Sequence, residues 1–400
     1  MADDADGPTR EHAGARDGFR AEVRAWLAEN LGGEFAGARG LGGPGREHEG
    51  LDVRLAWEQR LGKAGWTCLG WPVEHGGRGA SLAEQVIFFE EYARADAPHR
   101  MGHIGEGLIG PTIIDFGTAE QHRRFLPPIQ RGEEMWCQGY SEPDAGSDLA
   151  NVQTRAELVG GEWVIHGQKV WTSLAHVADW CFVVCRTEPG SQRHRGLSYL
   201  LVPMRQPGVE VRPIVQLTGT SEFNEVFFDG ARTAAANILG APGDGWRVAM
   251  ATLGYERGAS TLGQQIGFRR ELEGVIALAR RNGAGRDPVI RGRLAQSWIE
   301  LEIMRFNALR TMTSLGEGEP GPEVSIAKVY WSEWHRRLGE LALDVQGAAA
   351  LVADAEPYDL SDLQRLMLFS RADTIYAGSS EIQRNIIAER TLGLPREPRL

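Results

Sequence analysis

The sequence contains few cysteines, and their spacing does not fit a metal site. The four cysteines are Cys68, Cys137, Cys181 and Cys185, and no Cys-x-x-Cys pair occurs. A zinc site needs closely spaced Cys or His ligands, so none is expected here. Cys181 and Cys185 flank an apolar run that is typical of a strand, and they are predicted to be buried thiols.

A long apolar segment and an excess of positive charge are also missing. No window approaches the ~20 apolar residues that a membrane-spanning helix requires. The acidic N-terminus lacks the apolar centre of a signal peptide. The formal net charge is −11, so no basic surface is available for nucleic-acid phosphates or anionic lipids. These absences predict a soluble, cytoplasmic protein that binds neither nucleic acid nor membrane.

The chain is long enough for two or three domains, because it has 400 residues of ordinary globular composition. Hydrophobic periodicity changes twice along it. We therefore predict an α+β protein with an N-terminal α-helical domain (18–135), a central antiparallel β-barrel or sandwich (136–240) and a C-terminal four-helix bundle (241–395).

In the first region, apolar residues recur at helical spacing from Phe19 to Leu31, whereas residues 1–17 are polar and predicted to be disordered. Ser81 and Glu84 are spaced as a capping box for a helix over 82–93. Thr118 is placed to cap another helix. The helices expected beyond the first are 53–64, 82–93, 111–116 and 120–130.

The second region is rich in strands. Residues 155–159 and 163–166 are separated by a short link containing Gly160-Gly161, which is typical of a β-hairpin. Further strands are expected at 180–184, 197–202, 208–215 and 222–228. In the third region, helical patterns occupy 245–281, 288–315, 323–347 and 359–392, and short connections between them favour an antiparallel bundle.

The segment richest in residues suited to ligand binding is 138–149, Gln-Gly-Tyr-Ser-Glu-Pro-Asp-Ala-Gly-Ser-Asp-Leu. Such a segment exposes backbone N–H groups and hydroxyls together, which suits an electron-rich polar ligand. Turn chemistry alone leaves a second interpretation open, since a well-capped structural turn uses the same residues.

This segment and three later ones resemble, in the same order, motifs of the acyl-CoA dehydrogenase family. Segment 138–149 is similar to the family's flavin- and CoA-contacting turn. Segment 167–173 (Gly-Gln-Lys-Val-Trp-Thr-Ser) resembles the strand that stacks a tryptophan on the flavin. Segments 227–240 and 376–385 resemble the strand leaving the β-domain and the C-terminal cofactor loop. The resemblance implies FAD-dependent oxidation of an acyl-CoA thioester to trans-2-enoyl-CoA, with an electron-transfer flavoprotein as acceptor.

The resemblance also implies flavin contacts, one position at a time. Tyr140 would contact the flavin ring through its backbone, and Ser141 would offer its hydroxyl to the pyrimidine edge. Trp171 would pack on the isoalloxazine, and Ser173 would donate toward its N5 atom. Singly, each residue has a structural alternative, because tryptophans are usually core residues and serines often cap turns.

Further contacts follow for the rest of the ligands. Ser147 would lie near both the cofactor and the CoA arm of the substrate. Ser379 and Glu381 would lie beside the diphosphate and adenosine parts of FAD. Arg257 is the remaining candidate for substrate binding.

The catalytic base departs from the family's common pattern. Ala377 occupies the position where many relatives carry a catalytic glutamate. Its side chain cannot remove a proton, although its backbone N–H can still hold the thioester oxygen. Other relatives place the base in a Glu-Arg pair on a helix, and Glu256-Arg257 stands there in this sequence. Glu256 is therefore the candidate base, with a solvated helix carboxylate as the alternative and Asp373 as a weaker candidate.

Other departures concern partners and substrate. Segment 280–283 stands where relatives carry an Arg-x-x-Phe-Gly pattern, and segment 346–351 stands where they carry a glycine-rich one. Both patterns usually reach FAD across a subunit boundary. The sequence around Ser141 and the position of Glu256 resemble those of actinobacterial relatives that act on steroid side-chain CoA esters as α2β2 assemblies. A homotetramer or an α2β2 heterotetramer is expected. Ala377 replaces the larger glutamate of many relatives, and Gly254 has no side chain beside the expected acyl tunnel. Both leave space for a bulky or branched acyl group.

Two alternatives to this function remain open. One is a flavin oxidase of the same fold that passes electrons to O₂. The other is a non-catalytic or FAD-sharing subunit, which the absence of the usual glutamate motivates. A Gly-x-Gly-x-x-Gly match at 105–110 lacks a preceding strand and a βαβ unit, so a dinucleotide-binding fold is not expected. His99 and His103 are interpreted as surface or packing residues rather than metal ligands.

Overall fold

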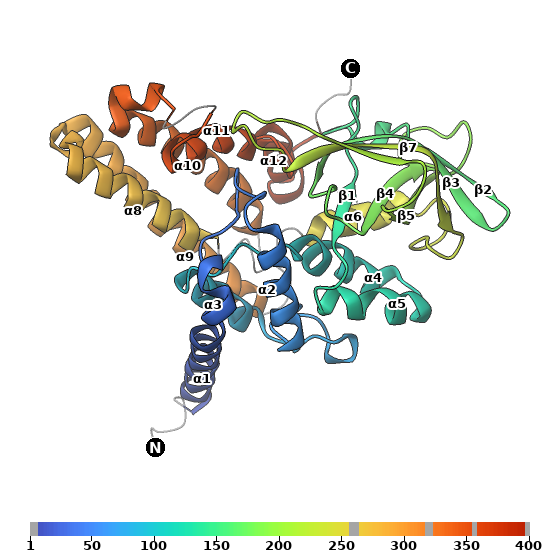
Figure 1. Ribbon diagram of the computed structural model, residues 1–400, viewed down its shortest axis with the longest axis horizontal. Coiled ribbons are helices and arrows are strands. Elements are labelled where there is room, and N and C mark those ends of the chain that lie inside the picture. Colours follow the sequence, from blue (N-terminus) through green and yellow to red (C-terminus); the bar gives the residue numbers. More distant parts are fainter. Residues whose placement is uncertain (1–6, 256–263, 317–322, 354–357, 397–400) are drawn as a thin grey trace.

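The computed structural model describes residues 7–255, 264–316, 323–353 and 358–396. Figure 1 shows the β-sheet (green) on one side of the molecule and the long helices α8 and α10 (orange) on the other, with the N-terminal helices (blue) between and below them. Helix α1 projects away from the body, and the N-terminus lies at its far end.

The N-terminal region is helical, as predicted, and both predicted caps are confirmed. Ser81 and Glu84 form a reciprocal capping box at α3, and Thr118 does the same with Gln121 at α5. The predicted disorder over 1–17 is wrong from Gly7 onward, because α1 begins there. Proline near a helix start breaks no helical hydrogen bond, so Pro8 fits that first turn. The α-helices are α1 (Gly7–Asn30), α2 (Leu51–Lys63), α3 (Leu82–Arg94), α4 (Gly110–Phe116) and α5 (Ala119–Gln130).

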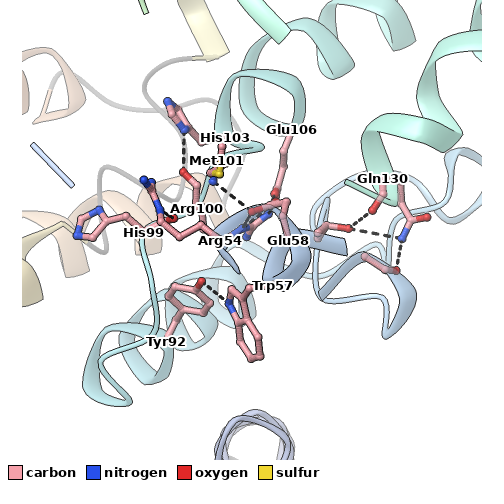
Figure 2. Close-up of polar contacts among 12 residues, drawn as sticks. Arg54, Trp57, Glu58, Tyr92, His99, Arg100, Met101, His103, Glu106 and Gln130 are labelled. Carbon is pink, nitrogen blue, oxygen red and sulfur yellow. Dashed lines mark hydrogen bonds and ion pairs between the residues drawn. The ribbon is translucent and has the colours of Figure 1, made fainter. Parts of the chain in front are cut away.

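A buried ionic cluster joins α2 to the segment before α4 (Figure 2). The guanidinium of Arg100 donates to both carboxylate oxygens of Glu58, at 2.6 to 3.0 Å, and also to Glu106. Burial alone would raise the pKa of Glu58, but the charge and hydrogen bonds of Arg100 hold that pKa below its usual value. The cluster fixes the 98–106 segment against the helices that precede it.

The central region forms one seven-stranded sheet in the order β1-β4-β2-β3-β7-β6, with β5 paired to β4. The prediction of a wholly antiparallel sheet is wrong, because β1 runs parallel to β4 and β2 meets β4 in parallel at Arg155 and Arg186. The chain returns through the β2–β3 hairpin to the same end of the sheet before entering β4. The strands are β1 (Trp136–Gly139), β2 (Arg155–Val159), β3 (Glu162–Ser173), β4 (Trp180–Arg186), β5 (Leu197–Pro203), β6 (Val209–Pro213) and β7 (Phe223–Ala234).

The predicted hairpin is confirmed. Val159 pairs with Glu162, so Gly160 and Gly161 form a two-residue loop, and both have positive φ angles. All four cysteines are buried free thiols, which confirms the expectation for Cys181 and Cys185.

The C-terminal helices divide into two groups. Helix α6 (Gly245–Tyr255) packs on the sheet through Val248 and Ala249, in the same core as β4 and β5. Four further helices share a separate core that is centred on Trp334 of α10. These are α8 (Gln265–Asn282), α9 (Pro288–Gly316), α10 (Glu323–Gln346) and α11 (Asp362–Asp373). The predicted run 245–281 therefore supplies helices to two different cores, with residues 256–263 outside the described part of the chain.

The single helix predicted over 359–392 is divided. Helix α11 ends at Asp373, and α12 (Ser380–Ile386) begins after a turn that contains Ala377 and Gly378, both with positive φ. Across the described residues, no helix is both long and apolar enough to cross a membrane.

Candidate active site

The turn that follows β1 is joined to β3 directly before Trp171. The backbone N–H of Val170 donates to the carbonyl of Ser141 at 2.9 Å. Within the turn, Glu142 and Ala145 exchange two backbone hydrogen bonds of 3.0 Å. Three of the predicted flavin residues, Ser141, Trp171 and Ser173, therefore come from two segments that are directly hydrogen-bonded to each other.

Trp171 is presented to solvent by an irregularity in the sheet. Between Lys169 and Thr172, three steps along β3 oppose two along β7, so β3 carries one extra residue. Trp171 lies in this bulge with a φ of 59°, and its side chain is 58% exposed. Bulges re-aim side chains at functional sites. The indole contacts the ring of Phe223 edge-on at 6.2 Å and leaves its other surface open for a flat ligand.

The two serines beside this indole have hydroxyls that are available to a ligand. Ser141 and Ser173 are partly buried, and neither hydroxyl has a hydrogen-bond partner among the residues that the structure describes. An exposed indole with two unpaired hydroxyls nearby fits an isoalloxazine ring, which offers an aromatic face and hydrogen-bonding edges. The residues present therefore fit a flavin.

A buried ion pair that the sequence analysis missed holds both segments. The ammonium of Lys169, fully buried, lies 2.8 Å from Glu142 and donates to the carbonyls of Tyr140 and Val184. Glu142 also accepts the backbone N–H groups of residues 153 and 154. Burial opposes its charged form, but Lys169 holds the pKa of Glu142 below its usual value.

Ser147 lies further along the same loop and is exposed. A cavity of about 730 Å³ is lined by residues of 151–157 and 186–193. None of the predicted flavin or CoA residues lines that cavity, so it is not assigned to the flavin site.

The two remaining predicted cofactor residues lie on the C-terminal side. Ser379 caps α12 by accepting the N–H of Ile382 at 3.3 Å, and Glu381 is exposed in the first turn of that helix. Neither makes a hydrogen bond or ion pair with the β-sheet among the described residues. Ala377, just before them, has a φ of 51°, and its carbonyl accepts from the side chain of Gln383.

A second ionic group, in which His335 and Asp373 are buried and Glu271 and Tyr376 are partly exposed, adjoins this loop. We call it the His335 cluster, and it comprises His335, Glu271, Asp373 and Tyr376. The imidazole lies 2.5 Å from Asp373 and 2.8 Å from Glu271, and the hydroxyl of Tyr376 donates to Asp373 at 2.6 Å. Burial alone would lower the pKa of His335, but the two carboxylates raise it to about 10.

The His335 cluster also accounts for Asp373, the weaker candidate for the base. Both of its carboxylate oxygens are engaged, and the residue is buried between helices. The leading candidates, Glu256 and Arg257, lie outside the described residues. Helix α6 is described up to Tyr255, whose hydroxyl donates to the carboxylate of Asp115 on α4.

Sequence reasoning missed the charged residues that support the site. Lys169 and Glu142 both lie inside the motifs that carry the resemblance, and a lysine inside an apolar strand is a signal for a buried partner. His335 lacked such a signal, because its partners lie 64 and 38 residues away. No group of three or more His, Cys, Asp or Glu side chains could hold a metal ion in the described ranges.

Models of known families match all three regions of the chain. The acyl-CoA dehydrogenase N-terminal domain matches residues 16–133, the middle domain matches 137–231 and the C-terminal domain matches 243–392. Acyl-CoA dehydrogenase IpdE1 of Mycobacterium tuberculosis is 64% identical over 379 residues, which cover 95% of this chain and 98% of IpdE1.

Solved structures agree with these matches. The Tcur3481-Tcur3483 steroid ACAD has a TM-score of 0.82 at 31% identity, covering 96% of this chain and 98% of that one. The ChsE4-ChsE5 complex from Mycobacterium tuberculosis has a TM-score of 0.77 at 30% identity, with the same coverage. The chain therefore belongs to the acyl-CoA dehydrogenase family, whose members are flavoproteins that use FAD to oxidise acyl-CoA.

Proposed function

We propose that this chain binds FAD and oxidises a bulky, ring-containing acyl-CoA thioester to its trans-2-enoyl product. The exposed indole of Trp171 beside the unpaired hydroxyls of Ser141 and Ser173 is the observation that carries the flavin part of the proposal. Bound FAD would supply the acceptor for the hydride that leaves the β-carbon. The protein's own contribution is to orient the reactants and to move the α-proton.

Each predicted residue has a defined task in this reaction. Trp171 packs on the flavin ring, while the backbone of Tyr140 and the hydroxyl of Ser141 contact its edge. Ser173 donates a hydrogen bond toward the N5 position, which favours negative charge there. Ser147 is exposed on the same loop and contacts the CoA arm.

Glu256 is the base that removes the α-proton. It follows the last described residue of α6, a helix that packs directly on the sheet carrying Trp171. The backbone N–H of Ala377 donates to the thioester oxygen and stabilises the developing enolate. Arg257 contacts the substrate, and Ser379 with Glu381 holds the distal part of FAD.

The substrate and assembly are inferred from the relatives. Two of the similar solved structures are the Tcur3481-Tcur3483 steroid ACAD and the ChsE4-ChsE5 complex. We infer a steroid-like acyl group and an α2β2 heterotetramer, with a homotetramer as the alternative. Exposed apolar side chains on α9 support a subunit interface there, because solvent-exposed apolar patches usually mark contacts. They are Trp298, Ile299, Ile303 and Phe306.

The domain boundaries belong to the same proposal. We infer an N-terminal helical domain over 18–135, a β-domain over 136–240 and a C-terminal domain over 241–395, with α8 to α11 as its four-helix bundle. The common core around Trp334 supports the bundle. Electron-transfer flavoprotein is the proposed electron acceptor.

The test is an anaerobic titration of the purified yellow protein, alone and with its partner subunit, against polycyclic and short straight-chain acyl-CoA esters. Bleaching of the flavin absorbance by the polycyclic ester is expected. Bleaching confined to short chains would overturn the substrate class, and rapid peroxide formation in air would favour the oxidase. A chain that purifies without flavin and gains none from its partner would favour the non-catalytic subunit.

A further inference from the structure

Four buried hydroxyl groups form a continuous chain between the flavin-contacting turn and helices α6 and α4. The hydroxyl of Tyr140 donates to that of Tyr199 at 3.3 Å, and Tyr199 lies 3.1 Å from the hydroxyl of Thr252. Thr252 in turn lies 2.9 Å from the hydroxyl of Thr112. All four residues are at most 5% exposed, and Tyr199, Thr252 and Thr112 are fully buried.

The hydrogen bonds of this chain can all be satisfied in one direction. Tyr140 donates to Tyr199, which donates to Thr252, which donates to Thr112. Thr112 then donates to the carbonyl of Leu108, 2.7 Å away, where the chain ends. The carbonyl of Val248 lies 3.0 Å from the hydroxyl of Thr252 and is an alternative acceptor for its single proton. A buried hydroxyl without a partner costs free energy, so removal of one member leaves its neighbour unsatisfied.

The hydroxyl chain joins elements that are far apart in sequence. Tyr140 directly precedes Ser141, Tyr199 lies on β5, Thr252 lies on α6 and Thr112 lies on α4. Thr252 is four residues before Glu256 in the sequence. The surrounding aromatic rings are packed, with Phe182 stacked on Tyr199 at 5.8 Å. The polar chain therefore crosses an apolar core, where directional contacts specify register more sharply than apolar contacts do.

We propose that this hydroxyl chain holds α6 in register with the flavin-contacting turn, which makes Tyr199 and Thr252 positioning residues for the dehydrogenation. The inference rests on the proposed function for its catalytic consequence, because the base follows α6 and the flavin edge follows Tyr140. Neither Tyr199 nor Thr252 touches substrate. Each acts through the two segments that it connects.

The test compares Thr252→Val, which keeps the side-chain shape and loses the hydroxyl, with Thr252→Ser, which keeps the hydroxyl and loses a methyl group. Tyr199→Phe removes one atom from the same chain. Each FAD-loaded variant, assembled with its partner subunit, is assayed for the single-turnover rate of flavin bleaching by acyl-CoA and for KM. Hydrogen–deuterium exchange of residues 245–255 reports the register of α6 without any reference to activity.

Thr252→Val and Tyr199→Phe are expected to slow bleaching about tenfold or more with little change in KM, because small misplacements of reacting groups are costly. Thr252→Ser is expected to react at close to the wild-type rate. Amides of α6 are expected to exchange faster in Thr252→Val than in Thr252→Ser. Bleaching of Thr252→Val at the wild-type rate would overturn the inference. Equal losses of bleaching rate in Thr252→Val and Thr252→Ser would also overturn it.

These outcomes separate the inference from the proposed function. If none of the acyl-CoA esters bleaches the flavin of the wild-type protein, the proposed function fails. The hydrogen–deuterium exchange comparison then tests the inference alone, and equal exchange of α6 in the two Thr252 variants overturns it. If Thr252→Val does not fold, Tyr199→Phe is the test variant in its place. Exchange of α6 and a bleaching rate equal to those of wild type in Tyr199→Phe would then overturn the inference.

Discussion

The two regions proposed to contact FAD are held in place by different means. In the β-sheet, the turn at Ser141 and the bulge at Trp171 are joined by backbone hydrogen bonds and by the fully buried Lys169–Glu142 pair. The C-terminal loop at Ala377 has no sheet to support it. Side chains from α8, α10 and α11 meet behind it in the His335 cluster.

This difference predicts unequal consequences for mutation. Lys169 on β3 bonds to Tyr140 and Glu142 in the turn and to Val184 on β4, so its loss should disturb the proposed contacts on the flavin ring. The His335 cluster supports one loop, and its imidazole keeps a second carboxylate if Asp373 is neutralised. The sheet should therefore control flavin binding, and the cluster should control the C-terminal loop.

The largest effect is expected from Lys169→Met, which leaves Glu142 charged and buried without its partner. Breaking a buried pair costs about 3–5 kcal/mol, so we expect a large fall in Tm and loss of bound FAD. Both are measured on purified protein by thermal melting and flavin absorbance.

The matched control is the double variant Glu142→Gln with Lys169→Met, in which neither side chain carries a charge. It should recover part of the lost stability. A single Lys169→Met variant that keeps wild-type Tm and flavin content would contradict the role given to this pair.

A smaller effect is expected from Asp373→Asn in the His335 cluster. The imidazole keeps Glu271, so we expect a loss of about 1–3 kcal/mol in the free energy of unfolding. FAD should stay bound, while KM for acyl-CoA rises because the loop at Ala377 loosens. Asp362→Asn, at an exposed position in the first turn of the same helix, is the control and should have little effect. Loss of FAD from Asp373→Asn would erase the distinction between the two regions.

Ser173→Ala tests a single flavin contact with little effect on the fold. The Ser173 hydroxyl has no partner among the described residues, so Tm should stay unchanged. The rate of flavin reduction should fall about tenfold, because a hydrogen bond that stabilises developing charge is lost. Stopped-flow absorbance measures the rate, and a wild-type value would remove Ser173 from the site.

A further prediction is a pH dependence of stability from His335. Its pKa is raised to about 10 in the folded protein, compared with about 6.5 when unfolded. A raised pKa stabilises the fold fully below about pH 6.5, and this contribution is lost as the pH rises toward 10. The groups that face the imidazole are Glu271 and Asp373, with Tyr376 and Lys328 beside Asp373.

The Tm difference between wild type and His335→Gln should therefore be larger at about pH 6 than at about pH 10. Thermal melts of both proteins across this range provide the measurement. A difference that grows with pH would show that the imidazole is not held in its charged form.

Local sequence signals predicted local structure well. The capping box at Ser81, the helix cap at Thr118 and the Gly160-Gly161 hairpin are confirmed because each depends on residues only a few positions apart. Helical periodicity over 359–392 missed the break at Ala377, because an alanine with positive φ carries no local signal, whereas the family resemblance indicated a loop at 376–385.

Non-local features could not be predicted in the same way. The parallel pairing of β1 with β4 depends on how the intervening hairpin returns, and strand periodicity contains no information on that direction. The motifs indicated Ser141, Trp171 and Ser173, and these roles remain predictions. The buried partners Glu142 and Lys169 lie 27 residues apart, and only the folded structure brings them together.

The most direct test of the central claim is single-turnover flavin reduction in Glu256→Gln, compared with wild type at equal FAD content. Glutamine keeps the size of the side chain but cannot accept the α-proton. We predict that the variant retains its flavin and that its bleaching by a polycyclic acyl-CoA ester is abolished. Bleaching at the wild-type rate would contradict the assignment of Glu256 as the base.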